Sequence, residues 1–191
     1  MPRLYGAFCE ERKEEDFSRV MIHVVCFGNL WQGDDGFGIR VFQRLSGLRD
    51  WPPHVKVFEA GTAGLAALGY FEDCRKAVIV DALKTGASPG CVFRLTLDEI
   101  EAHDEAFSLH QLGVNHLLAA MTAAFAGRDV PEVVVIGAEA GEIHPFTDRL
   151  SPPLEAALDP AVNMIVRECT NWREPLASLH WNQSDSGGLI I

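Results

Sequence analysis

Apolar residues along the chain gather into five short runs, each bounded by polar, glycine or proline residues. Runs of about four to eight apolar residues are typical of strands that are buried in a sheet. We therefore predict strands at Met21–Phe27, Val55–Glu59, Ala77–Val80, Cys91–Leu97 and Val133–Ile136. The run at Cys91–Leu97 alternates more between apolar and polar positions, which favours an edge strand.

Between these runs, apolar residues recur at the spacing of one helical face. This periodicity predicts helices at Gly38–Leu48, Leu65–Tyr70, Gln111–Phe125 and Ser151–Trp172. In the last of these segments, Ser151-Pro152 and Asp159-Pro160 both have the form of an N-cap residue followed by proline at the first helical position. We expect two helices in series there.

Strands that alternate with helices indicate a sheet joined by right-handed crossovers and covered on both faces. The expected fold class is α/β, a single three-layer domain with a mostly parallel, twisted five-stranded sheet. The 191 residues suffice for one core, which we place at residues 21–173. Residues 1–20 are highly charged and lack an apolar stretch, so we expect a solvated leader and no secretory signal. Residues 174–191 have the composition of a mobile tail.

The chain carries 16 basic and 27 acidic residues, a net charge of −11. This charge repels phosphate backbones and anionic lipids, which argues against a nucleic-acid or membrane partner. The five cysteines are scattered and include no Cys-x-x-Cys pair, so neither a disulfide framework nor a cysteine zinc site is supported. We expect a cytoplasmic protein in which Cys26 and Cys169 are small core residues.

A glycine-rich loop, Phe27–Gly38, connects the first predicted strand to the first helix and carries two adjacent carboxylates, Asp34 and Asp35. Phosphate-binding loops use backbone N–H groups and usually a lysine, whereas this loop offers acids and lacks a Gly-Lys-Ser/Thr ending. The loop is therefore better suited to a cation. Either aspartate could instead cap the helix, and both roles are compatible if one caps while Asp35 points into the crevice.

Other candidate residues also follow strands. In open α/β sheets, ligands bind outside the carboxyl ends of the strands, near the switch point of the topology. Asp81 ends the third predicted strand, Glu59 ends the second, and His110 comes after the fourth. Asp35, Asp81 and His110 would then form a divalent-metal site with an open position for substrate.

Each candidate also has a structural explanation. Asp81 could cap a turn, and His110 could be a helix-start residue with a satisfied ring. Three further residues after the fifth strand, Glu139, Glu142 and His144, are reserve ligands, although a surface loop explains them better.

Standard hydrolase signatures are missing, since there is no His-Glu-x-x-His and no Gly-x-Ser-x-Gly. Trp31 is a large aromatic residue in a polar loop. It either packs beneath the loop or offers an apolar face to a partner chain, and we favour packing.

Taken together, these motifs resemble the hydrogenase maturation endopeptidases, which trim the large subunit of nickel–iron hydrogenases. The resemblance covers about residues 21–170 and rests on Gly28-Asn29-Leu30, Gly33–Gly38, Gly61–Gly64, Asp81-Ala82 and His110-Gln111.

The resemblance implies a cut near the C-terminus of the large-subunit precursor. It implies that Asp35, Asp81 and His110 bind metal, that the nickel arrives already inserted in the substrate, and that other divalent ions can occupy the site. Asp35 and Asp81 are candidate catalytic residues. Glu59 is a third, although many family members have Asp-Gly where this chain has Glu59-Ala60.

Several alternatives stay open. The metal could polarise the scissile carbonyl, activate water, or serve only as a recognition handle while a carboxylate acts as base. The chain could also be a nickel-dependent chaperone or checkpoint that binds the same precursor without cutting it. We expect a monomer that forms a transient complex with the nickel-loaded precursor.

Overall fold

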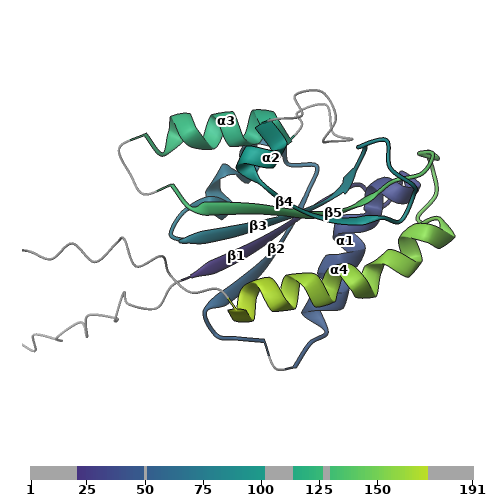
Figure 1. Ribbon diagram of the computed structural model, residues 1–191, viewed down its shortest axis with the longest axis horizontal. Helices are drawn as coiled ribbons and strands as arrows, with labels where there is room; N and C mark the ends of the chain where they lie inside the picture. Colours follow the sequence, from purple (N-terminus) through teal and green to yellow (C-terminus); the bar gives the residue numbers. More distant parts are fainter. Residues whose placement is uncertain (1–20, 50, 102–113, 127–129, 172–191) are drawn as a thin grey trace, which may run out of the picture.

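A computed structural model describes residues 21–49, 51–101, 114–126 and 130–171 of the chain. It contains one five-stranded sheet with helices on both faces (Figure 1). The strands are β1 (Ile22–Phe27), β2 (Val55–Gly61), β3 (Lys76–Leu83), β4 (Val92–Thr96) and β5 (Glu132–Glu139). The α-helices are α1 (Phe37–Ser46), α2 (Leu97–Glu101), α3 (Val114–Ala124) and α4 (Pro152–Asn171), and the 3-10 helices are η1 (Gly33–Gly36) and η2 (Gly64–Phe71).

The sheet has the strand order β2-β1-β3-β5-β4. β1 is parallel to β2 and β3, and β3 is parallel to β5, whereas β4 is antiparallel to β5 at the edge. The mostly parallel five-stranded sheet and the edge position of the fourth strand are therefore confirmed. Because β4 runs against its neighbour, its last residue, Thr96, pairs with Val134 near the start of β5.

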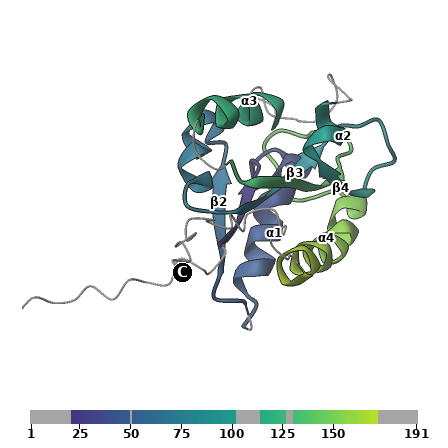
Figure 2. The ribbon, with the colours of Figure 1, turned by 60° about the vertical axis from the view of Figure 1, so that its left-hand side comes forward.

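Two apolar clusters hold the helices to the sheet. On one face, Val24, Val78 and Ile136 pack with apolar residues of α1 and α4. On the other face, Val25 and Ile79 pack with residues of η2, α2 and α3. The turned view shows the two helix layers on opposite sides of the strands (Figure 2). The three-layer arrangement follows from the alternation of side chains along strands that are buried on both faces.

The expectation of two helices in series at the C-terminal segment was wrong. α4 is a single helix of 20 residues, and Pro160 lies inside it. Its buried residues continue past the proline at helical spacing, with Leu158 and Ala161 on either side of it, so packing against the sheet outweighs the local break signal. Asp159 contacts Arg44 of α1 and does not begin a new helix.

β1 differs from the prediction by one residue, whereas β3 and β5 each run three residues further at the carboxyl end, to Leu83 and Glu139. The predicted helix at Leu65–Tyr70 is the 3-10 helix η2. None of the helices in the described ranges has both the length and the apolar character needed to cross a bilayer. The expected leader and tail, and residues 111–113 of the predicted third helix, lie outside the described residues.

Candidate active site at the switch point of the sheet

The switch point of this topology lies between β1 and β3, because the chain leaves β1 toward β2 on one side and returns to β3 on the other. This is where ligands bind in open α/β sheets. Asp35 lies in η1, directly after β1 and its loop, and Asp81 lies on β3. η1 contacts β3, so the structure brings the two elements that carry these carboxylates together.

Glycines in the loop allow this close approach. A Cβ atom at Gly38 would lie 2.0 Å from the carbonyl oxygen of Phe27 and 2.7 Å from that of Val80. A Cβ atom at Gly28, where φ is +143°, would lie 2.4 Å from the carbonyl oxygen of Asp35. Only glycine fits such distances, so the glycine-rich pattern serves to seat η1 and α1 on the ends of β1 and β3.

Asp35 is held in place by its backbone. Its carbonyl oxygen accepts a hydrogen bond from the N–H of Asn29 at 3.1 Å, and its own N–H donates to the carbonyl oxygen of Gln32 at 3.3 Å. The residue is 3% exposed. These two main-chain hydrogen bonds help to fix the position of Asp35, and a change of side chain would leave them intact.

The sequence pattern predicted that Asp81 ends its strand, but β3 continues for two more residues. The pairing of β3 with β1 ends at Val80, however, so Asp81 is the first β3 residue beyond the β1 ladder. Its Oδ1 accepts a hydrogen bond of 2.8 Å from the N–H of Ala82, and it is 2% exposed. Because side chains alternate along a strand, Asp81 shares the α2 and α3 face with Ile79 and Leu83.

Asp34 has a different role from its neighbour. Its carboxylate accepts hydrogen bonds from the N–H of Gly141 at 2.9 Å, the N–H of Ser151 at 2.6 Å and the hydroxyl of Ser151 at 2.9 Å. It therefore joins the loop after β1 to the start of α4. Neither aspartate caps α1, whose N-cap residue is Gly36 and has no side-chain hydrogen bond.

Glu59 lies away from this pair. It is exposed on the edge strand β2, and β1 separates it from β3. It pairs with Cys26, and alternation along β2 places it on the α1 and α4 face, opposite to Asp81. Burial, together with the charges of Glu59 and Asp81, raises the pKa of the Cys26 thiol above its ordinary value. The expectation that Cys26 is a core residue is confirmed by its full burial.

His110 lies outside the described residues, so its position relative to Asp35 and Asp81 stays a prediction. β4 is antiparallel to β5, so its end lies beside the start of β5 and away from the carboxyl ends of the parallel strands; following β4 does not place His110 near Asp35 and Asp81. The relevant element is α3, which begins at Val114 and belongs to the face that carries Asp81. α3 leads back toward the start of β5, so its first turn is directed toward the carboxyl edge.

Of the three reserve ligands, Glu139 is already engaged. It is 2% exposed and accepts hydrogen bonds from the N–H and hydroxyl of Thr85 and from the N–H of Gly86, which fixes the loop after β3. Glu142 and His144 are exposed in the loop before α4, as the surface-loop explanation expected. Within the described ranges, no group of three or more His, Cys, Asp or Glu side chains is arranged to hold a metal ion.

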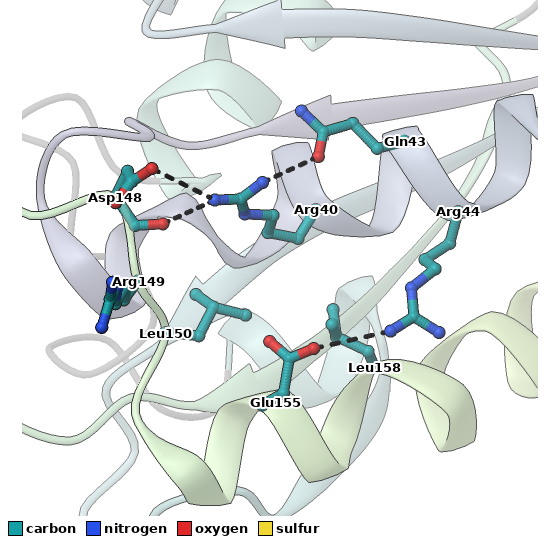
Figure 3. A pocket seen from close by; sticks show the side chains of 8 residues that line it. All are labelled: Arg40, Gln43, Arg44, Asp148, Arg149, Leu150, Glu155 and Leu158. Atoms are coloured by element: carbon teal, nitrogen blue, oxygen red, sulfur yellow. Dashed lines mark hydrogen bonds and ion pairs between the residues drawn. The ribbon is translucent and has the colours of Figure 1, made fainter.

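A separate groove of about 440 Å³ lies between α1, α4 and the loop before α4 (Figure 3). Arg40 turns toward Gln43 and Asp148, and Arg44 turns toward Glu155. Because acids accompany these arginines, the groove does not offer a concentrated positive charge. Asp35 and Asp81 do not line it, so it is distinct from the switch-point site.

The fold and these positions define an α/β protein with two buried carboxylates at the switch point of its sheet. The family model described as HycI, hydrogenase maturation protease, matches residues 39–168. The chain is 29% identical over 158 residues to the hydrogenase expression/formation protein HupD of Rhodobacter capsulatus. The aligned region covers 82% of this chain and 74% of HupD. The chain is also 28% identical over 149 residues to the hydrogenase 2 maturation protease of Escherichia coli, with 77% and 89% covered.

The solved structure of the hydrogenase maturating endopeptidase HybD from Escherichia coli matches the chain with a TM-score of 0.68 and 27% identity, covering 79% of this chain and 94% of HybD. The chain belongs to the hydrogenase maturation protease family. It is a maturation endopeptidase that processes the C-terminus of the nickel–iron hydrogenase large subunit. The resemblance noted in the sequence is confirmed, and the alternative of a non-proteolytic chaperone is set aside.

Proposed function

We propose that Asp35, Asp81 and His110 bind the nickel ion that the large-subunit precursor carries, and that this contact places the scissile bond for cleavage. The observation that supports the proposal is the burial of two carboxylates at the switch point, 3% and 2% exposed, on elements that contact each other. The switch point is where ligands bind in open α/β sheets, and carboxylate oxygens are suitable ligands for a divalent cation.

The donor set fits a divalent ion. Carboxylate oxygens and an imidazole nitrogen suit borderline ions such as nickel, and three protein ligands leave coordination positions for groups of the substrate. The ion therefore belongs to the precursor and serves as the handle by which the protease recognises it. With the precursor bound, one of the two carboxylates acts as the base for the water that attacks the peptide bond.

This arrangement makes cleavage depend on nickel insertion. Bonds between the ion and the two chains contribute binding free energy only when the precursor carries nickel, and they orient the C-terminal extension beside the carboxylates. A precursor without nickel lacks that contribution and stays uncut.

The test compares variants on nickel-loaded precursor, with the cut product counted by intact mass. Asp35→Asn keeps the backbone contacts of the loop and removes ligand charge, so it should melt within about 2 °C of the unmodified protein yet lose at least about 100-fold in kcat/KM. Asp81→Asn and His110→Ala should behave alike. Glu142→Gln, which removes an exposed acid from the nearby loop, is the matched control and should retain full activity.

Glu59 is the third acid to test. Because it lies on the edge strand and on the other face of the sheet, Glu59→Gln should cut at nearly the unmodified rate. A loss comparable to that of Asp35→Asn would show that the precursor engages β2 and would place Glu59 back among the catalytic residues. Full activity of Asp35→Asn would contradict the proposed nickel contact itself.

The remaining parts of the proposal concern setting and extent. We place the protease domain at residues 21–173, and we infer that it acts in the cytoplasm as a monomer that binds the nickel-loaded precursor transiently. Four cysteines in the described ranges carry free thiols, as is usual in a reducing compartment. Sedimentation of the purified protein alone and with precursor tests the monomer and the complex.

A further inference from the structure

Two large aromatic side chains stand exposed beside the switch-point site. Trp31 is 68% exposed and Phe146 is 94% exposed. The expectation that Trp31 packs beneath its loop was therefore wrong. Exposed aromatic residues of this size are uncommon on a surface without a partner, and they are enriched where proteins bind each other.

The loops that carry them are joined to each other. Gln32 and Thr147 form a parallel bridge, and the N–H of Gly33 donates to the carbonyl oxygen of Thr147 at 2.9 Å. Trp31 and Phe146 are the residues immediately before the two bridge partners. The side-chain Oδ1 of Asn29 also accepts a hydrogen bond of 3.0 Å from the N–H of Trp31. These hydrogen bonds hold the loops of Trp31 and Phe146 next to each other.

Phe146 is held in a strained conformation. Its φ is +63°, in the left-handed region, which is unfavourable for a bulky side chain. Its side chain gains no burial in return within the protein, being almost fully exposed. Backbone strain of this kind is concentrated at active sites and ligand-binding sites.

We propose that Trp31 and Phe146 form a docking platform for apolar side chains of the precursor segment next to the cleavage point. Trp31 precedes Asp35 by four residues in the same loop. Four residues of chain span at most about 15 Å, so Trp31 lies within that distance of the proposed nickel ligand. The inference rests on the proposed function, because it takes Asp35 as the point where the precursor engages.

The size of the platform favours a substrate segment over a second copy of the chain. Two aromatic side chains at these exposures offer about 300–400 Å² of apolar surface. A stable dimer buries about 800 Å² on each partner, roughly twice as much. A short peptide segment, held additionally by the metal contact, needs no more than the platform provides.

The experiment measures cleavage of nickel-loaded precursor by Trp31→Ala, Phe146→Ala and the double variant. Loss of an aromatic anchor should raise KM, with about a tenfold or greater rise for the double variant and kcat within about twofold, because the reacting groups stay in place. Leu48→Ala is the matched control: this exposed apolar residue follows α1 at the far end of that helix and should change neither constant.

A second variant separates binding from folding. Phe146→Gly removes the aromatic ring and fits the left-handed φ without strain, so it should be at least as stable to heat as the unmodified protein and still show the raised KM. A thermal unfolding scan measures this stability.

Three results would overturn the inference. If the unmodified protein cuts the precursor and the double variant does so with an unchanged KM, the platform is wrong while the proposed function stands. If sedimentation shows a dimer that the double variant abolishes, the occupant is a second copy. If the unmodified protein leaves nickel-loaded precursor uncut, the proposed function fails and the platform falls with it.

Discussion

Replacing Asp34 with alanine should destabilise the fold, although this residue adjoins the proposed nickel ligand Asp35. The carboxylate of Asp34 accepts hydrogen bonds from two backbone N–H groups and one hydroxyl, at 2.6 to 2.9 Å, across 107 and 117 residues of sequence. Asp34 is 1% exposed, so in the folded protein its carboxylate lies in the interior together with the bonds that it accepts. Truncation would leave the N–H groups of Gly141 and Ser151 unsatisfied.

The expected size of the effect follows from those contacts. A hydrogen bond to a charged acceptor contributes about 1.5–3 kcal/mol, and the three share one acceptor group, so their loss should cost about 4 kcal/mol in total. For a domain of this size, each kcal/mol shifts the melting temperature by about 2–4 °C. Asp34→Ala should therefore melt about 8–16 °C lower, measured by circular dichroism.

Ser151→Ala provides the matched control, because it removes the hydroxyl and keeps the backbone N–H bond to Asp34. It should cost about 1 kcal/mol, and the double variant Asp34→Ala with Ser151→Ala should be no less stable than Asp34→Ala alone. A melting temperature for Asp34→Ala within about 2 °C of the unmodified protein would show that the hydrogen bonds of Asp34 to Gly141 and Ser151 do not stabilise the fold.

Three more predictions concern stability and the thiols. Gly38→Ala would place a Cβ atom 2.0 Å from the carbonyl oxygen of Phe27, so it should fold poorly and lose cleavage; a normal melting curve would contradict the seating of α1. Hydrogen bonds from Arg94 and Lys76 lower the pKa of Glu168 to about 2. The stabilisation by the ionised Glu168 is therefore complete above pH 4.5 and is lost as the pH falls toward 2. The unfolding free energies of Glu168→Gln and the unmodified protein should converge over this pH range. Gentle alkylation should modify the exposed Cys91 and leave cleavage intact; loss of cleavage without unfolding would indicate a catalytic thiol.

The sequence predicted the places of Asp35 and Asp81 in the fold because local pattern and topology agree there. An apolar run, a glycine-rich loop and an amphipathic helix sufficed to place Asp35 after the first strand. The strand pattern likewise brought Asp81 to the carboxyl side of the sheet, one residue past the end of the β1 ladder. These inferences need only the period of the apolar residues and the rule that parallel strands share an edge.

Contacts between distant segments could not be predicted in this way. Nothing local to Asp34 or Glu139 indicates that each carboxylate fixes another loop, because their partners lie far along the chain. The antiparallel direction of β4 is not evident from the sequence pattern, and because of it the chain after β4 does not start from the carboxyl ends of the parallel strands. Asp159-Pro160 locally indicates a helix start, but the apolar face that α4 buries against the sheet outweighs this signal.

The sequence left Trp31 open between packing beneath its loop and exposure to a partner, with packing favoured, and it gave no indication of Phe146. Trp31 and Phe146 are separated by more than a hundred residues, and only the bridge between Gln32 and Thr147 brings their loops together. A composition-based rule assigns large aromatic residues to the interior. The positive φ of Phe146, which points to a functional reason for its position, is not readable from the sequence around it.

Nickel-dependent cleavage is tested most directly by comparing nickel-loaded and nickel-free large-subunit precursor, each incubated with the unmodified protein and followed by intact mass. We predict that the nickel-loaded precursor loses its C-terminal extension while the nickel-free precursor keeps its full mass over the same period. Equal cleavage of the two precursors would contradict the claim that Asp35 and Asp81 engage a nickel ion presented by the substrate.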